Sequence, residues 1–134
     1  MTPKISSSPF NNAVEQLASL PGIGNKTALR LVLQVLNRNQ QEIEAFGKAF
    51  IELSNEIQYC NSCHNISDTT KCDLCASPIR NDNVICVVEN ILDVIAIERT
   101  NQFQGKFHVL GGIISPMEGI GPNDIKIPEL IERI

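Results

Sequence analysis

The 134-residue chain contains no tryptophan, one tyrosine and five phenylalanines, so an extensive aromatic core is excluded. It also lacks any run that approaches the ~20 consecutive apolar residues needed by a membrane-spanning helix. Residues 1–10 contain no apolar segment of the kind found in secretory signals. We therefore expect a protein of the reducing cytoplasm that spans no membrane, in which paired cysteines bind metal more often than they form disulfides.

An excess of positive charge is also missing. The chain carries 11 basic and 15 acidic side chains, which gives a formal net charge of −4 and at first argues against a nucleic-acid partner. The two signs balance within residues 1–58 and within residues 59–80, however, so residues 81–134 account for the whole acidic excess. The net charge therefore does not describe the surface of the first two segments.

Residues 1–58 have the apolar spacing of helices. Apolar side chains recur at intervals of three and four over residues 10–20, 25–36 and 41–58. The stripe on the third of these helices is typical of core or helix-pair packing. Its length and regular spacing also allow it to pair with a helix of another subunit.

Two glycines, Gly22 and Gly24, stand between the first two helices. Glycine permits a tight turn, and the backbone N–H groups that open the following helix are available to an anion. Lys26 and Arg30 add positive charge to that end of the helix. This pattern fits a phosphate-binding site, and it equally fits an ordinary helical-hairpin turn with basic residues on its surface.

Four of the five cysteines form two Cys-x2-Cys pairs with eight residues between them. Tetrahedral Zn²⁺ takes four thiolates, and two such pairs supply two each, which predicts one structural zinc ion. Two disulfides or unligated thiols are the alternative. We expect His64 to be a polar neighbour of the site, and Lys71 and Arg80 to moderate its negative charge. The expected ligands are Cys60, Cys63, Cys72 and Cys75.

The last segment alternates strand and helix. Residues 84–88 form a β-branched run of strand length, residues 90–100 have helical spacing, and residues 107–110 suggest a second strand. Strand, helix and strand in this order predict a parallel sheet, followed by a helix from residue 127. We expect Cys86 to be a small buried apolar residue of the first strand. Two strands make a small core, so the domain is expected to be incomplete.

Four segments, in this order along the chain, carry a family resemblance: LPGIGNKTALRL, CNSCHNISDTTKCDLC, VICVVENILDVIAIE and FHVLGGIISPMEGIGPNDIKIPEL. In combination they resemble the RecR family of bacterial recombination mediators over residues 12–134. The resemblance implies an α+β protein built of several modules. These are a helical helix-hairpin-helix region at 1–58, a zinc finger with four cysteine ligands at 59–78, and the first part of a Toprim domain, with its parallel α/β sheet, at 83–134.

The resemblance also implies a function. Members of the family are non-enzymatic proteins of recombinational DNA repair that bind DNA without reading its sequence, in the bacterial cytoplasm at the nucleoid. They act with RecO and RecF to promote the loading of RecA on gapped or single-stranded DNA, and they assemble as dimers or ring-shaped tetramers. At the matching positions, the four cysteines are the expected zinc ligands. The expected DNA-binding residues are Gly22, Gly24, Lys26 and Arg30.

Glu89 stands where catalytic Toprim enzymes carry a conserved glutamate. Those enzymes hold Mg²⁺ with a later Asp-x-Asp pair, and this chain contains no Asp-x-Asp. We therefore expect Glu89 to be a non-catalytic carboxylate, and Asp93 and Glu98 to face solvent or a partner. A Toprim-type Mg²⁺-dependent nuclease and a purely structural oligomerisation module remain the alternatives. Family members continue well past residue 134, so we expect this chain to be a truncated product or a fragment.

Overall fold

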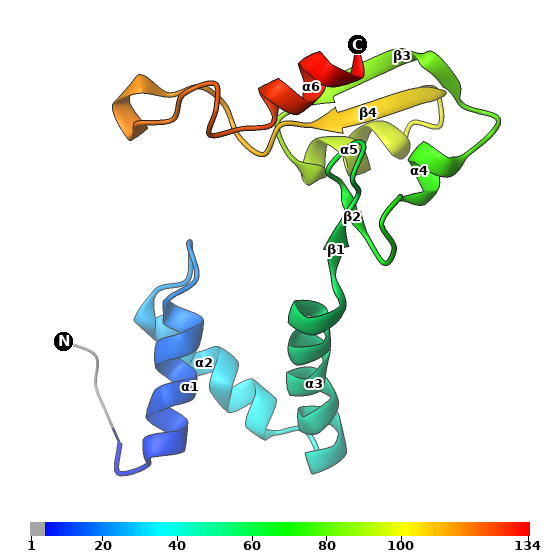
Figure 1. The fold of residues 1–134 in the computed structure, drawn as a ribbon. Coiled ribbons are helices and arrows are strands. Elements are labelled where there is room, and N and C mark those ends of the chain that lie inside the picture. The colour runs from blue at the N-terminus through cyan, green and yellow to red at the C-terminus, as the bar shows by residue number, and fades with distance from the viewer. Residues whose placement is uncertain (1–4) are drawn as a thin grey trace. The chain divides into compact units, whose positions relative to one another are not determined.

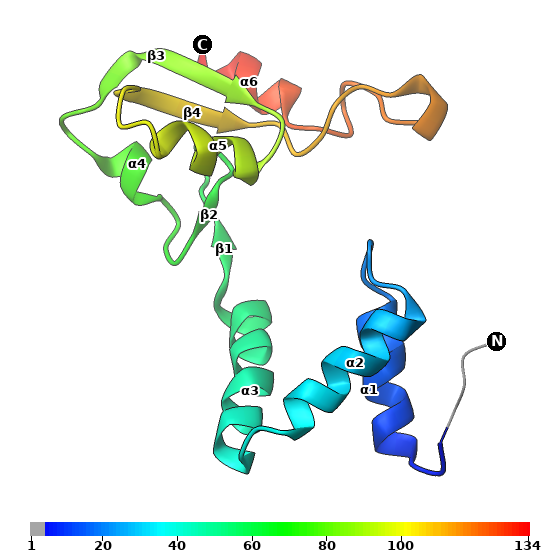
Figure 2. The same ribbon diagram turned by 180° about the vertical axis from the view of Figure 1, so that it is seen from behind.

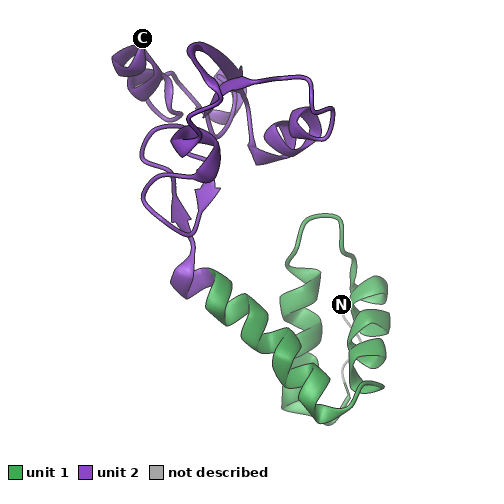
Figure 3. Ribbon diagram, turned by 90° about the vertical axis from the view of Figure 1, so that its right-hand side faces the viewer, with its two compact units in different colours: residues 1–53 green, residues 54–134 purple. Residues whose placement is uncertain are grey.

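The computed structural model describes residues 5–134, and its elements follow one another as shown in Figure 1. The chain divides into two compact units, residues 1–53 and residues 54–134, which are coloured separately in Figure 3. Each unit has its own buried apolar cluster. Each is therefore described by itself.

The first unit is a helical hairpin. Helix α1 (Ser8–Ala18) begins where the Ser7 side chain accepts a hydrogen bond from a backbone N–H of the first turn, and α2 is Asn25–Leu36. The apolar faces of the two helices meet at Val14, Ala28 and Val32, which are 2%, 0% and 7% exposed. The spacing over residues 10–20 and 25–36 thus predicted both helices. It did not predict the whole packed face of α2, because Leu33 and Leu36 of the apolar stripe are exposed whereas Ala28 is buried.

Helix α3 (Gln40–Glu56) begins and ends within two residues of the predicted bounds, 41–58. None of its side chains is buried. Phe46 and Phe50 stack edge to face with ring centroids 5.3 Å apart, yet they are 41% and 60% exposed. The guanidinium of Arg38 lies 5.7 Å from the ring centroid of Phe46. The apolar stripe of α3 therefore faces solvent within this chain.

After the last residues of α3, the second unit continues with a small hairpin and a short helix that the sequence pattern did not predict. Strands β1 (Gln58–Tyr59) and β2 (Ile66–Ser67) pair antiparallel, and α4 spans Asp73–Ala76. Two-residue strands and a single helical turn are too short to leave a periodic signal in sequence. Together they place the four cysteines of the two pairs around one point.

The rest of this unit contains the expected parallel pair. Strand β3 (Asn81–Val88) leads into α5 (Ile91–Glu98), which returns the chain to β4 (Gly105–Val109). Val88, Val94 of α5, Phe107 and Val109 form its buried core. Cys86, opposite Phe107 in the register, is only half-buried, so its prediction as a buried residue was wrong.

Successive side chains of β4 point to opposite faces of the strand pair. Phe107 packs with the core beside α5, whereas His108 bonds to residues at the start and end of α6 (Ile127–Arg133). Figure 2 shows α5 and α6 on these two sides of the strands. A loop with one 3₁₀ turn, η1 (Pro116–Glu118), connects β4 to α6. Both faces of β4 are thus covered, which explains why all five of its residues are buried.

Candidate metal centre and nucleic-acid interface

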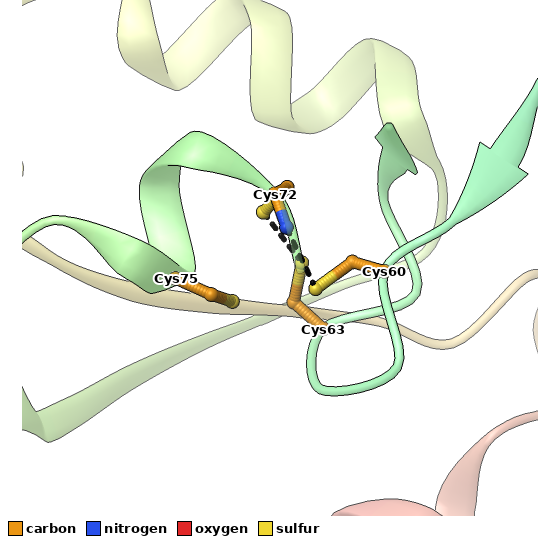
Figure 4. Close-up of side chains that lie close together, drawn as sticks. All are labelled: Cys60, Cys63, Cys72 and Cys75. Atoms are coloured by element: carbon orange, nitrogen blue, oxygen red, sulfur yellow. Dashed lines mark hydrogen bonds between the residues drawn. The ribbon is translucent and has the colours of Figure 1, made fainter. Parts of the chain in front are cut away.

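The four cysteines of the two Cys-x2-Cys pairs converge in the second unit (Figure 4). All four are buried, and their sulfur atoms lie within 4.8 Å of one another. Cys63 Sγ and Cys72 Sγ are 3.4 Å apart, and the backbone N–H of Cys72 donates to Cys60 Sγ at 3.4 Å. Each thiol is free, so the disulfide alternative does not describe this structure.

The thiols interact strongly with one another. A hydrogen bond with the Cys63 thiol lowers the pKa of Cys75 to about 5, and the same bond raises the pKa of Cys63. Desolvation by burial raises the pKa of Cys72. The cluster thus readily forms a thiolate, the form of cysteine that binds metal. Four clustered sulfur donors of this kind fit one tetrahedral zinc ion, whose Zn–S bonds of about 2.3 Å place sulfur atoms about 3.8 Å apart.

Local backbone geometry shapes the first cysteine pair. The N–H of His64 donates to the carbonyl of Cys60 at 3.0 Å, and the N–H of Cys60 donates to the carbonyl of Asn65 at 2.7 Å. His64 takes a left-handed conformation with φ of 64°, which closes the turn. Its ring stacks edge to face on His108, with centroids 5.4 Å apart. His64 is therefore a polar neighbour of the cysteines, as expected, and the sulfur cluster does not include it.

Strand β4 contacts the cysteine module, by which we mean residues 57–77 with the four clustered cysteines. The N–H of Val109 donates to the carbonyl of Cys63 at 2.8 Å, on the edge of the strand that does not pair with β3. Leu74, between the second pair of cysteines, packs against both the cysteine cluster and the core of the strand pair. The cysteine module and the strand–helix–strand unit therefore share one core.

The cations beside the cysteines differ from those predicted. Lys71 is exposed, and Arg80 is committed elsewhere: its guanidinium donates to both carboxylate oxygens of Glu98 and, at 3.1 Å, to the carbonyl of Gly105. The buried cation that contacts the cysteine module is Lys106. The prediction for Arg80 failed because its partner lies 18 residues further along the chain.

Two acidic residues of helix α5, Asp93 and Glu98, have partners within the chain. Asp93 forms a reciprocal capping box with Asn90, and Glu98 is the half-buried partner of Arg80. Both carboxylates thus have hydrogen-bond partners within the chain, a structural role that the sequence pattern did not predict for them. An asparagine followed by an acidic residue three positions later was the signal for the capping box.

His108 is another buried polar residue that the sequence analysis did not single out. Its ring is fully buried; Nε2 lies 2.7 Å from the carbonyl of Lys126, and Nδ1 lies 3.1 Å from Nη1 of Arg133. A carbonyl can only accept and a guanidinium can only donate, so His108 is the neutral tautomer with its proton on Nε2. Burial, with a further effect of the Arg133 charge, lowers its pKa.

The glycine turn lies in the first unit, between α1 and α2. Gly22 has φ of 83°, a left-handed conformation that favours glycine, and Gly24 is the N-cap residue of α2. No side chain among residues 5–134 caps this end of α2, and its first turn contains no acidic residue. Lys26 and Arg30 are both exposed, and their spacing of four residues places them on one side of the helix. The start of α2 is thus open and positively charged.

Glu89 immediately follows β3 and is exposed. Its backbone carbonyl accepts a hydrogen bond from Gly111 at 2.8 Å, which extends the pairing of the two parallel strands beyond their ends. Nearby, a pocket of about 390 Å³ is lined in part by His64, Asn90 and Lys126. Over residues 5–134, the four cysteines make the only group of three or more residues that could hold a metal ion, and Glu89 is not among them.

The predicted site residues thus form two groups. The four cysteines converge in the second unit, and the open start of α2 with its two basic side chains lies in the first. Lys106 and His108 were missed because both lie in a short strand whose five residues are all buried. A lysine and a histidine there have no spacing that distinguishes them from surface residues.

Comparisons with known families match three consecutive parts of this chain. Residues 10–53 match the RecR helix-hairpin-helix model, residues 57–77 match the model of the RecR four-cysteine zinc finger domain, and residues 83–133 match the Toprim domain model. The zinc finger match and the four buried cysteines agree with one structural zinc ion. No helix within residues 5–134 is long and apolar enough to cross a membrane.

Curated relatives named "Recombination protein RecR" align with nearly all of the chain. The protein of Phocaeicola vulgatus is 54% identical over 93% of this chain, and that of Bacteroides fragilis is 50% identical over 100%. The protein of Parabacteroides distasonis is 52% identical, again over 100%. The aligned part covers 61%, 65% and 64% of these relatives, so the chain spans less than two thirds of their length. Over the part that it spans, this chain belongs to the RecR family.

Proposed function

We propose that this chain binds the sugar–phosphate backbone of DNA, without reading its sequence, as part of a mediator of recombinational DNA repair. The observation that carries the proposal is the glycine turn that opens α2. Its first-turn N–H groups have no side-chain cap among residues 5–134, and exposed Lys26 and Arg30 stand one helical turn apart beside them. The names of its relatives, "Recombination protein RecR", support the repair context.

The chemistry of this turn suits a phosphate group. Phosphate oxygens accept hydrogen bonds from the backbone N–H groups at a helix start, where the helix dipole is positive. Gly22 and Gly24 have no Cβ, so the backbone can approach the nucleic acid closely. Contacts of this kind position a protein on the backbone and carry no sequence information. We therefore assign DNA binding to Gly22, Gly24, Lys26 and Arg30.

In this proposal the metal ion has a structural role. Cys60, Cys63, Cys72 and Cys75 supply all four ligands, which leaves no open position for a substrate. A bound zinc ion would cross-link the two cysteine pairs, which lie in segments with few apolar side chains of their own. Val109, through its hydrogen bond to Cys63, and Leu74, through its packing, attach these segments to the strand pair.

The remaining features of the proposal follow the family. Acting with RecO and RecF, the protein promotes the loading of RecA on gapped or single-stranded DNA, and it performs no catalysis itself, so Glu89 is a non-catalytic carboxylate. It acts as a homo-oligomer. The exposed apolar stripe of α3, which includes Phe46, Phe50 and Leu53, offers a surface for subunit pairing.

A binding titration tests the DNA site. Fluorescence anisotropy of a labelled mixed-sequence single-stranded oligonucleotide is followed at several salt concentrations, with wild type and with K26A/R30A. We expect the double variant to bind at least about tenfold more weakly at low salt. The slope of log K against log[salt] should decrease in magnitude by roughly 1.4, because each phosphate contact on a single strand contributes about 0.7.

The matched control is K48A/K71A, which removes the same charge from two exposed lysines that do not belong to the turn. It should bind like wild type. Equal losses in both double variants would show that DNA responds to overall charge and would refute the assigned site. Mg²⁺-dependent cleavage of the oligonucleotide that disappears in E89Q would instead favour the nuclease alternative.

A further inference from the structure

Lys106 is a buried lysine near the start of β4, in the parallel strand pair. The residue is 4% exposed, whereas the other lysines within residues 5–134 are all exposed. A buried ammonium is costly unless hydrogen bonds and negative charge replace its water. Its position next to Phe107, in the core of the second unit, therefore requires an explanation from its contacts.

All three protons of this ammonium have acceptors in one place. Lys106 Nζ lies 3.1 Å from the carbonyl oxygen of Leu74, 2.9 Å from that of Cys75 and 2.9 Å from that of Ser77. These carbonyls surround the end of α4, the turn that carries the second cysteine pair. A carboxylate oxygen of Asp82 lies 3.4 Å away, but that side chain is 85% exposed. The backbone of the cysteine module thus provides the main replacement for water.

The positive charge of Lys106 lies beside a site that becomes negatively charged when it binds zinc. Four thiolates around one Zn²⁺ carry two net negative charges, and a nearby buried cation offsets part of them. Lys71, directly before Cys72 in sequence, is exposed, so its charge is largely screened by water. Lys106 approaches the module from β4, 31 residues away from Cys75.

We propose that Lys106 is the positioning residue that couples the metal centre to the parallel strands. Its ammonium fixes the backbone around Cys75 and compensates the charge of the thiolates. The metal, in turn, holds those carbonyls in the arrangement that accepts the ammonium. Metal retention and order at this part of β4 therefore depend on each other. The inference rests on the proposed ligand set and is independent of DNA binding.

The first test compares K106M with K71M in the full chain. Each loses one positive charge and keeps an unbranched side chain, but only K106M loses the three hydrogen bonds. Zinc transfer to a chromogenic chelator is followed in native buffer. We expect K106M to release zinc at least about tenfold faster than wild type, and K71M to stay within about twofold. An unchanged rate in K106M, or equal acceleration in K71M, would overturn the proposal.

A second measurement uses only wild type and so does not depend on the folding of K106M. Lysine ammonium protons that are buried and fully hydrogen-bonded exchange slowly with water, and ¹⁵N-lysine NMR detects them. Lys106 is the one lysine of residues 5–134 placed to give such a signal. We expect the signal in the zinc-loaded protein and its loss after chelation. Its persistence without metal would refute the coupling. Zinc content, measured beforehand, tests the ligand assignment separately.

Discussion

The ion pair between Arg80 and Glu98 connects the segment after the cysteine module to the end of α5. Arg80 donates through both terminal nitrogens to the Glu98 carboxylate and also to the carbonyl of Gly105. The two side chains are 12% and 28% exposed. Replacement of Arg80 by methionine keeps much of the aliphatic packing and removes every one of these hydrogen bonds.

The loss of stability in R80M can be estimated from the hydrogen bonds removed and from the unpaired carboxylate that remains. The variant loses a two-bond contact to a charged group and one bond to a backbone carbonyl, and the Glu98 carboxylate then remains half-buried without its partner. Removing one member of a buried pair costs about 3–5 kcal/mol, and water that reaches Glu98 reduces this figure. We expect the free energy of unfolding of the second unit to fall by about 2–3 kcal/mol.

Urea denaturation followed by tyrosine fluorescence measures this change. The chain has one tyrosine and no tryptophan, and Tyr59 lies in β1, so the signal reports on the second unit. A double-mutant cycle with E98Q isolates the pair: the two changes together should cost roughly 1–2 kcal/mol less than their sum. Additive effects, or a loss below about 0.5 kcal/mol for R80M, would refute the claim that this contact stabilises the unit.

Two further perturbations test the packing and the buried imidazole of the second unit. A Cβ at Gly105 would lie 2.6 Å from both Phe103 Cζ and the carbonyl oxygen of Val84, so G105A should lower the free energy of unfolding by about 1–3 kcal/mol in urea denaturation. The matched change G47A, on exposed α3 with open space around it, should not destabilise the chain; equal losses would contradict the packing argument. Burial lowers the pKa of His108 below its ordinary 6.5, so the unfolded chain takes up this proton first and stability should fall as pH drops below about 6.5. In H108Q the urea midpoint should depend less on pH than in wild type. An unchanged pH dependence would show that His108 does not cause the loss of stability at low pH.

Much of the architecture could be predicted because it follows from patterns of residues that are close together in the sequence. Apolar side chains at intervals of three and four gave the three N-terminal helices, and two Cys-x2-Cys pairs gave the cysteine cluster. The run of β-branched residues before Glu89 gave the first parallel strand, although β3 begins at Asn81, three residues before the predicted start. In each case the signal lies within a few consecutive residues.

The rest depended on contacts between residues far apart in sequence. Lys106 meets Cys75 across 31 positions, and Arg80 meets Glu98 across 18. Arg80 was predicted to lie beside the cysteines because it is positively charged and close to them in sequence. In the folded chain Arg80 pairs with Glu98, and Lys106 contacts the backbone beside Cys75 instead. Only the paired strands bring these side chains together, so no spacing rule could have selected them.

The central claim is that the glycine turn at the start of α2 is where DNA binds. A ¹⁵N NMR titration of the full chain with single-stranded DNA tests it most directly, because backbone amide shifts report which N–H groups meet the phosphate. We expect the largest changes at Gly22, Gly24 and Lys26, with smaller ones at Arg30 and none of comparable size in the second unit. The largest changes at residues 54–134, with the turn unaffected, would contradict the account.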